Sequence, residues 1–244
     1  MKIVKLDAID STNRYLKNLR LSKSVDDYTV VVAKEQYAGR GQMGTVWQSE
    51  AGKNLIFSVL KYFSNFSSHN QFQINICVSL AIYNALKELK ITNLKIKWPN
   101  DILSGSHKIC GILIENVLYG AQIQSSIIGI GLNVNQLNFS NLPNVSSLRL
   151  LSGKNYDLED LLAQIIPHLK LNFSKLENNE FTQLKEAYLT ALFRKDKVTT
   201  FKNNITNTIF VGIIKDVSKE GKLIISTEDN NQVLFDLKQV KMLF

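Results

Sequence analysis

Hydrophobic positions along residues 1–195 follow two different periods. Continuous apolar runs rich in β-branched residues, at 29–34 and 54–62, indicate buried strands. The segments 10–21 and 70–90 instead repeat apolar residues at helical spacing, and the first of them opens with polar residues that can cap a helix. Because strands and helices do not alternate strictly, we expect an α+β fold.

The middle of the chain predicts a short strand, a rigid turn and a hairpin. The alternating run 94–97 ends at Trp98 and Pro99, because proline has no N–H to donate to a sheet. The runs 109–118 and 123–132 are typical of two strands joined by a tight turn. A polar loop and two helical stretches follow, at 135–147, 157–176 and 178–193.

The pattern changes after residue 195. Short strand-like runs separated by Asn, Asp and Gly turns fill the rest of the chain, which is typical of a small all-β barrel. We therefore expect two domains, 1–195 and 196–244, of which the second is the barrel. The runs are 197–201, 209–217, 222–227, 232–237 and 240–244.

The composition of the 244 residues narrows the class of protein. Hydrophobic residues make up 45% and charged residues 20%, so we expect a globular chain rather than a disordered or fibrous one. No apolar run approaches the roughly 20 residues that a membrane helix needs, and Asp7 interrupts the N-terminus before a secretory signal can form. Cys77 and Cys110 lie in apolar stretches, which indicates buried thiols in a reducing cytoplasm.

The net charge of +8 raises the question of an anionic partner such as nucleic acid. The basic excess is spread over the chain, and no block of like charge stands out. A nucleic-acid-binding module needs a basic stripe interleaved with aromatic residues, which this distribution does not favour. The charge alone therefore assigns no partner.

The loop 39–44, with the sequence GRGQMG, is the strongest local signal for a ligand. Its glycines permit close approach of the backbone, and Arg40 can bond a carboxylate or a phosphate. No Gly-Lys-Ser/Thr follows, as a P-loop requires, and no helical pattern follows, as a dinucleotide-binding fingerprint requires. The loop predicts an anion-holding segment of another kind; the alternative is an ordinary flexible loop with a solvated arginine.

Two further segments place charged groups beside strand ends. Residues 97–101, KWPND, present a cation, an amide and a carboxylate on a rigid turn, although a plain Asn-Asp turn closed by proline is the alternative. Lys108 precedes the apolar run 109–118 and can hold a carboxylate as a point charge, or extend to solvent from a strand edge. Neither segment decides a function by itself.

Two other segments offer glycine-rich or polar positions. Residues 129–135, GIGLNVN, place glycines inside a predicted strand, which marks either a close approach to a ligand or a bulge. Residues 11–13, STN, can cap a helix or read a polar ligand head. The three histidines lack the spacing of a metal site, and neither a nucleophile elbow nor a Cys/His pair is present.

The order and spacing of these motifs resemble those of bacterial biotin protein ligases. The resemblance covers about residues 5–244 and implies a mixed central sheet flanked by helices, as in class II synthetases, with a small SH3-like barrel at the C-terminus. It also implies that biotin and ATP form biotinyl-5′-AMP with release of pyrophosphate, and that biotin then passes to a lysine of a biotin carboxyl carrier domain. The motifs that carry it are 11–13, 36–47, 97–101, 108–115 and 129–135.

The same resemblance implies which residues bind biotin. Ser11, Thr12 and Gln36 match the residues that read the ureido head, and Lys108 matches the lysine that contacts the carboxylate. The loop at Arg40 would close over the ligand. The full implied set is Ser11, Thr12, Asn13, Gln36, Gly39, Arg40, Gly41, Gln42, Lys108, Gly111 and Gly131.

The resemblance likewise implies the site for ATP and the adenylate. Arg40 and Lys108 would offset the charge of the two reacting anions, and Asp101 would lie near the phosphates and a magnesium ion. These three residues form the expected catalytic group. The implied nucleotide set, in which Trp47 packs on the adenine, is Arg40, Gln42, Trp47, Lys97, Asn100, Asp101, Lys108 and Asn133.

Departures from the family pattern lead to further expectations. The family commonly carries arginine where this chain has Gln42 and Thr45, so we expect weaker retention of the adenylate. The first motif begins at residue 11, so we expect a ligase without a DNA-binding domain, acting in the cytoplasm as a homodimer or monomer and contacting neither DNA nor membrane. The alternatives are a lipoate ligase or octanoyltransferase, with a pocket for a plain acyl chain, and a catalytically inert biotin-binding protein.

Overall fold

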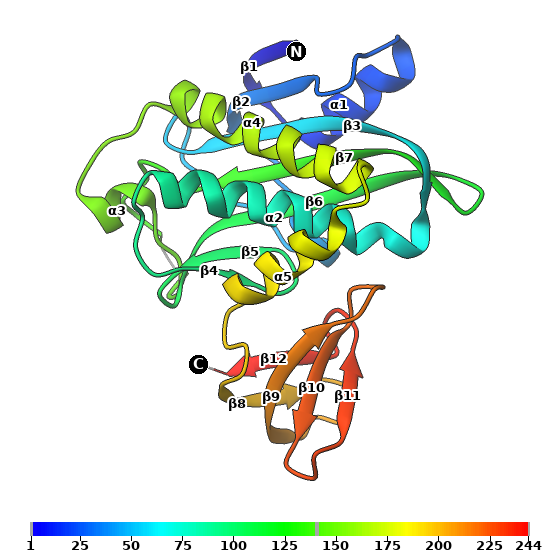
Figure 1. Ribbon diagram of the computed structural model, residues 1–244. Helices are drawn as coiled ribbons and strands as arrows, with labels where there is room; N and C mark the ends of the chain where they lie inside the picture. Colours follow the sequence, from blue (N-terminus) through cyan, green and yellow to red (C-terminus); the bar gives the residue numbers. More distant parts are fainter. Residues whose placement is uncertain (1, 140–141, 244) are drawn as a thin grey trace.

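Seven strands form the larger of two sheets in the computed structural model, which describes residues 2–139 and 142–243 (Figure 1). Their order is β1-β2-β3-β7-β6-β5-β4, with β1 and β2 parallel and the other neighbours antiparallel. The sheet is therefore mixed, as expected. The strands are β1 (Ile3–Ile9), β2 (Val30–Gln36), β3 (Leu55–Ser67), β4 (Leu94–Lys97), β5 (Asp101–Ser104), β6 (His107–Tyr119) and β7 (Gln122–Leu132).

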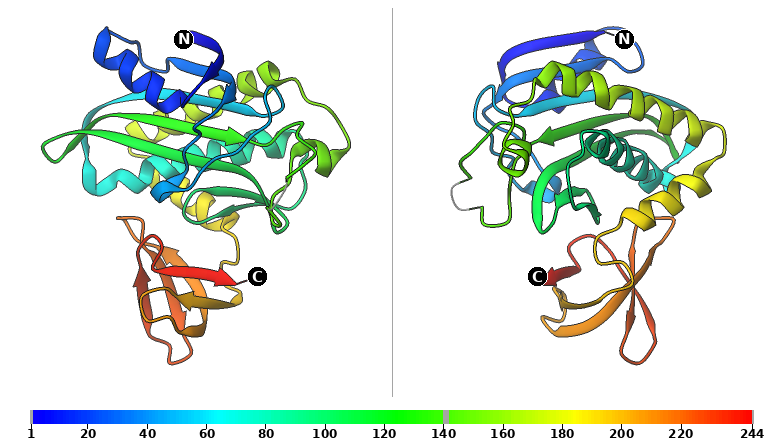
Figure 2. Two further views of the ribbon diagram at one scale, coloured as in Figure 1. Left: turned by 180° about the vertical axis from the view of Figure 1, so that it is seen from behind. Right: turned by 60° about the vertical axis from the view of Figure 1, so that its left-hand side comes forward.

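Helices cover both faces of this sheet. Three of them, α2, α4 and α5, lie on one face (Figure 1), and α1 lies on the opposite face, seen from behind in Figure 2. Alternation along β2 separates the two cores, because Val30 packs on the α2 side while Val31 packs with Leu16 of α1. The helices are α1 (Thr12–Ser22), α2 (Gln71–Glu88), α3 (Leu148–Ser152), α4 (Leu158–Glu177) and α5 (Phe181–Ala191), with 3₁₀ turns η1 (Gln42–Gly44) and η2 (Ser68–Asn70).

Three elements were not expected from the sequence. β1 is a half-exposed edge strand with weak alternation of burial. β5 begins at Asp101, two residues after Pro99, so the proline ends β4 without ending the sheet. α3 is a short helix that follows the polar loop and is capped by Ser147, whose hydroxyl oxygen accepts the N–H of Leu150. Each is too short or too polar to show a clear hydrophobic period.

The C-terminal strands form a second sheet in the order β11-β10-β9-β8-β12, all antiparallel, within the described residues. Its core is built on Phe201, Ile214 and Ile225. The hydrogen-bonded order leaves β11 and β12 as edges, so the expected barrel is not closed into a ring by its backbone. The strands are β8 (Val198–Asn203), β9 (Ile209–Val217), β10 (Leu223–Thr227), β11 (Gln232–Phe235) and β12 (Val240–Leu243).

The turn between β9 and β10 docks the second sheet on the first unit. The Trp98 indole Nε1 donates to the carbonyl oxygen of Gly221 at 2.8 Å. Gly221 has φ +94°, and a Cβ there would lie 2.5 Å from the Phe72 ring. Glycine is therefore required by conformation and by contact at this position.

Lys61 on β3 is buried between two acidic side chains and several aromatic rings. Its side chain is 6% exposed, and its Nζ lies 3.0 Å from Asp27 Oδ2 and 2.7 Å from Glu177 Oε1. It also lies 5.0 Å from the centre of the Tyr28 ring. Burial lowers the pKa of Lys61, but the hydrogen bonds to Glu177 and Asp27 outweigh it and hold that pKa above its ordinary value.

Replacing Lys61 by methionine should lower the free energy of unfolding by about 2–3 kcal/mol at neutral pH, because both carboxylates lose their partner. Urea denaturation measures this difference. The pKa of Lys61 is higher in the folded protein than in the unfolded chain. Its contribution to the free energy of unfolding is therefore complete below the pKa of the unfolded state, and it is lost as the pH rises through the pKa of the folded state. The difference should therefore shrink in strongly alkaline buffer. Lys34→Met, in the exposed pair with Asp7, should leave the denaturation midpoint unchanged.

Candidate active site

A cavity of about 430 Å³ opens on the face of the large sheet that carries the N-terminus of α1. Strand register explains its floor. Ser58 of β3 pairs with Gly129 of β7, and Gly131 pairs with Gly111 of β6. Positions two apart on a strand face the same side, so one row holds Ser58, Gly129 and Leu113 and the next holds Ile56, Gly131 and Gly111, with glycines at the centre. The volume and the small-residue floor suit a small organic ligand.

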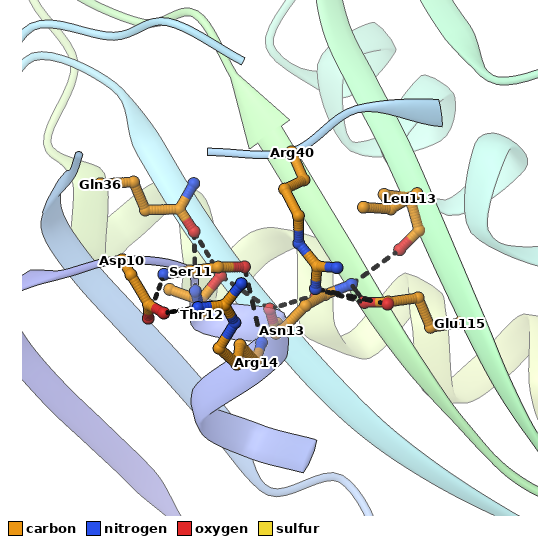
Figure 3. A network of polar contacts seen from close by, with 10 residues as sticks. Asp10, Ser11, Thr12, Asn13, Arg14, Gln36, Arg40, Leu113 and Glu115 are labelled. Carbon is orange, nitrogen blue, oxygen red and sulfur yellow. Dashed lines mark hydrogen bonds and ion pairs between the residues drawn. The ribbon is translucent and has the colours of Figure 1, made fainter. Parts of the chain in front are cut away.

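Thr12, Asn13 and Gln36 line this cavity and form a polar cluster with the buried Ser58; the first three are labelled in Figure 3. Thr12 donates its backbone N–H to Gln36 Oε1 at 2.7 Å, and its hydroxyl lies 3.0 Å from the same oxygen. Ser58 Oγ lies 2.7 Å from Thr12 Oγ1 and 2.6 Å from Asn13 Oδ1. Thr12, Asn13 and Ser58 are buried, so these contacts are shielded from water.

The cluster has more oxygen contacts than hydroxyl protons. Asn13 donates its amide N–H to Glu115 and to the Leu113 carbonyl, so its Oδ1 can only accept. The Ser58 proton then goes to Asn13, and the Thr12 hydroxyl can donate either to Gln36 or to Ser58. One oxygen of the cluster can therefore still accept a hydrogen bond, and an N–H group of a ligand would donate it.

Gly129 makes room for the cluster. A Cβ at this position would lie 2.5 Å from Asn13 Oδ1 and 3.0 Å from its Cγ. Real Cβ atoms do not approach other atoms so closely. The absence of a side chain at Gly129 therefore decides where the Asn13 amide can lie.

The loop 39–47 folds back on itself above the cavity floor. Trp47 donates its backbone N–H to the Gly39 carbonyl at 3.0 Å, and Gly41 donates to the Thr45 carbonyl at 2.7 Å. The Trp47 ring then lies on the floor, since a Cβ on Gly131 would be 2.5 Å from its Cε2 and one on Gly111 would be 3.1 Å from its Cζ3. The glycines on β6 and β7 thus accommodate an aromatic ring.

Cations gather at one end of the cavity. Lys97 at the end of β4, Lys108 on β6 and Lys241 on β12 all line it. Lys108 Nζ lies 2.6 Å from Asp101 Oδ1 and forms an ion pair with it, although the angle does not suit a hydrogen bond. Burial and the positive charges of Lys108 and Lys241 lower the pKa of Lys97, although Asp101 acts the other way. This end is suited to an anionic group.

Arg40 lines the same cavity and is paired with an acidic side chain of β6. Its Nη2 is 3.3 Å from both carboxylate oxygens of Glu115 (Figure 3). Glu115 and Lys108 are seven positions apart on β6, but the Lys108 Nζ lies beside Gly111, 3.2 Å from where a Cβ on that glycine would be. Arg40 and Lys108, which the sequence led us to expect at one reacting centre, thus line one cavity, with Arg40 paired to Glu115.

Most of the residues expected from the sequence line one cavity. Gly39 and Asn133 do not: Gly39 closes the loop through Trp47, and the Asn133 amide donates to the Ser146 carbonyl at 3.0 Å. The expected residues that do line it are Ser11, Thr12, Asn13, Gln36, Arg40, Gly41, Gln42, Trp47, Lys97, Asn100, Asp101, Lys108, Gly111 and Gly131.

Sequence reasoning missed Ser58 of the polar cluster, and it missed three polar residues of the C-terminal unit that line the cavity, Asn204, Lys238 and Lys241. Ser58 could have been found, because it is a hydroxyl inside the apolar run 54–62. Lys241 gave no such signal, since only the docking of the second sheet brings it to the cavity.

The described residues hold no group of three or more His, Cys, Asp or Glu side chains arranged for a metal ion. A magnesium ion needs only one or two carboxylates when phosphates supply the other ligands. Asp101 fits that requirement, because its Oδ1 is buried and makes no hydrogen bond. Within the same residues, no helix is long and apolar enough to cross a membrane.

Sequence comparison relates the chain to one family. The pattern of the Biotin/lipoate A/B protein ligase family matches residues 6–133. The biotin–[acetyl-CoA-carboxylase] ligase of Paracoccus denitrificans is 28% identical over 233 residues, which cover 92% of this chain and 94% of that protein. The bifunctional ligase/repressor BirA of Bacillus subtilis is 27% identical over 94% of this chain and 70% of its own length.

Solved structures agree with these matches. The biotin protein ligase of Aquifex aeolicus in complex with biotin and ATP superposes with a TM-score of 0.80 at 25% identity, covering 99% of this chain and 98% of that one. The Leishmania major enzyme in complex with biotinyl-5-AMP gives a TM-score of 0.66 at 20% identity over 96% of this chain and 98% of that one, which supports the fold.

Proposed function

Because the chain belongs to the biotin/lipoate A/B protein ligase family, we propose that it is an ATP-dependent biotin protein ligase. Its substrates are biotin and ATP, and its product is a biotinylated carrier protein. The relatives named as biotin–[acetyl-CoA-carboxylase] ligases point to a biotin carboxyl carrier domain as the acceptor.

The polar cluster carries the choice of biotin over the other acids of the family. A ureido ring brings N–H donors, and the cluster is one proton short for its oxygen contacts. The plain chain of octanoate and the dithiolane of lipoate bring no such donor and would leave the buried oxygens unpaired. Leaving buried polar groups unpaired costs more than a missing apolar contact, so the cluster discriminates strongly.

The lysine-rich end suits the first chemical step. A carboxylate oxygen of biotin attacks the α-phosphorus of ATP, and the bond to the departing pyrophosphate breaks. We propose that Lys97, Lys108 and Lys241 offset the repulsion between the two anions, and that Asp101 holds magnesium together with the phosphates. The metal would supply further positive charge. Trp47, beside Lys108, remains the proposed contact of the adenine.

The second step transfers the acyl group. The neutral amine of the acceptor lysine attacks the carbonyl of biotinyl-AMP, and AMP leaves. Asp101 lies at the same end as Lys108 and can orient that amine or accept its proton once Lys108 has turned to the ligand. We propose residues 1–195 as the unit that carries both steps and residues 196–244 as the unit that covers the lysine-rich end.

Pyrophosphate exchange into ATP, measured with biotin, lipoate and octanoate side by side, tests the proposed function. Exchange with biotin alone is the expected result. Exchange with lipoate or octanoate in preference to biotin would assign the other branch of the family. Biotin binding without exchange would identify an inert binding protein.

Lys241→Gln should raise the KM for ATP about fivefold at neutral pH, because a cation is lost from the phosphate end. It should also change the pH profile. Lys241 lowers the pKa of Lys97, so its removal raises that pKa, and the alkaline rise in KM should begin at higher pH than in the parent protein. If the pH profile of the KM for ATP is the same in the variant and the parent protein, Lys241 does not affect the charge of Lys97.

The wider setting remains part of the proposal. We expect the enzyme to act in the cytoplasm, as a homodimer or monomer, and to bind neither DNA nor membranes. A mobility-shift assay with duplex DNA tests the expected absence of DNA binding. Sedimentation of the purified chain tests whether it is a homodimer or a monomer.

A further inference from the structure

Glu115 contacts both the polar cluster and the glycine-rich loop. Its Oε2 accepts the Asn13 amide N–H at 2.7 Å, and both of its carboxylate oxygens lie 3.3 Å from Arg40 Nη2 (Figure 3). The catalytic steps described above make no use of this carboxylate. It faces the same side of β6 as Gly111 and Leu113, two residues that line the cavity.

These contacts join into one continuous chain. Glu115 holds Asn13, Asn13 meets Ser58, Ser58 meets Thr12, and Thr12 donates to Gln36. Each link is 3.0 Å or shorter. The side chain at one end of the chain therefore influences the hydrogen-bond directions at the other.

The direction of this chain is set at Asn13 by two groups that accept from its amide, the Glu115 carboxylate at 2.7 Å and the Leu113 carbonyl at 3.3 Å. An ionised carboxylate has no proton to donate, so it forces the Asn13 N–H toward itself and turns the Asn13 oxygen toward Ser58. The Ser58 proton is then committed to Asn13. The oxygen that remains free to accept from a ligand lies at the Thr12 end of the chain.

We propose that Glu115 is a positioning residue for biotin, which sets the hydrogen-bond polarity of the polar cluster and holds Arg40 over it. This inference rests on the proposed function. Arg40 is thereby held beside the polar cluster as part of the closing loop. Glu115 acts through Asn13 and Arg40 and need not touch the reacting atoms.

Titration calorimetry of biotin without ATP, together with the KM for ATP, tests the inference on the full chain. Glu115→Ala removes both contacts and should weaken biotin binding about tenfold. Glu115→Gln keeps the shape, but its amide can donate as well as accept and has no charge for Arg40, so about fivefold weaker binding is expected. In both variants the KM for ATP should stay within about twofold of the parent value.

A double-mutant cycle separates the two contacts. In an Arg40→Gln background, Glu115→Gln should cost less than it does alone, because the charge pair is already lost. Glu159→Gln, in the exposed ion pair with Lys5, serves as a matched control and should leave biotin binding unchanged. Equal denaturation midpoints for all variants exclude a folding defect.

Biotin affinity that is unchanged in both Glu115 variants would overturn the inference. So would a rise in the KM for ATP as large as the loss of biotin affinity, because that would place Arg40 and Glu115 at the phosphates. These outcomes differ from failure of the proposed function, in which the parent protein itself would not bind biotin.

Discussion

Lys108→Ala is expected to lower kcat/KM for biotin-dependent pyrophosphate exchange by about a thousandfold. Lys108 reaches into the end of the cavity where the carboxylate and the triphosphate must approach each other. A positioned charge in such a site commonly supplies 10²–10³ in rate, roughly 3–4 kcal/mol. The loss is at the upper end here because Asp101, 2.6 Å from the Lys108 ammonium in the parent protein, loses its ion-pair partner while it faces two anions.

The pairing with Asp101 predicts a partial rescue. Asp101→Asn in the Lys108→Ala background removes the uncompensated carboxylate and should restore about tenfold in kcat/KM, although magnesium binding suffers. Single-turnover formation of biotinyl-AMP measures this step apart from transfer. Lys95→Ala is a fitting control, because Lys95 lies on the same strand as Lys97 and donates outward to the Thr190 carbonyl. Exchange at the parent rate in Lys108→Ala would remove Lys108 from the chemistry.

The sequence was sufficient to find the strands and helices with a strong hydrophobic period. It also led to most of the cavity, because Arg40, Lys97 and Lys108 lie in segments with special composition, and the family resemblance added Gln36. It did not show β5, which is four residues long and follows a proline. The register between β5 and β6 brings Asp101 close to Lys108. This register depends on tertiary packing, which the local sequence does not show.

The position of Arg40 shows a second limit of sequence reasoning. Glycines on either side of an arginine predict a loop that can hold an anion, but they do not say toward which end of the sheet the side chain turns. Glu115, seven residues beyond Lys108, determines that direction through an ion pair across distant segments. For Asn133 the sequence likewise gave no sign of the hydrogen bond that its amide donates to the Ser146 carbonyl.

Gly129→Ala should weaken biotin binding about fiftyfold while leaving the KM for ATP within about twofold. The added methyl would lie 2.5 Å from Asn13 Oδ1. Asn13 is 3% exposed and sits in the first turn of α1, so it cannot retreat without breaking its bonds to Ser58 and Glu115. The floor would stay flat, but the cluster would lose the geometry that accepts a ligand N–H.

The outcome shows whether the polar cluster recognises biotin or only packs in the core. Gly120→Asn is the control, because Gly120 lies in the turn of the same β6–β7 hairpin, has φ +57° and would meet nothing within 4 Å, a conformation that asparagine tolerates. Calorimetry with biotin should therefore show parent affinity for Gly120→Asn and a large loss for Gly129→Ala. If Gly129→Ala also binds as tightly as the parent, the Asn13 amide has no part in recognising biotin, and specificity must then come from Gln36 and the loop 39–47.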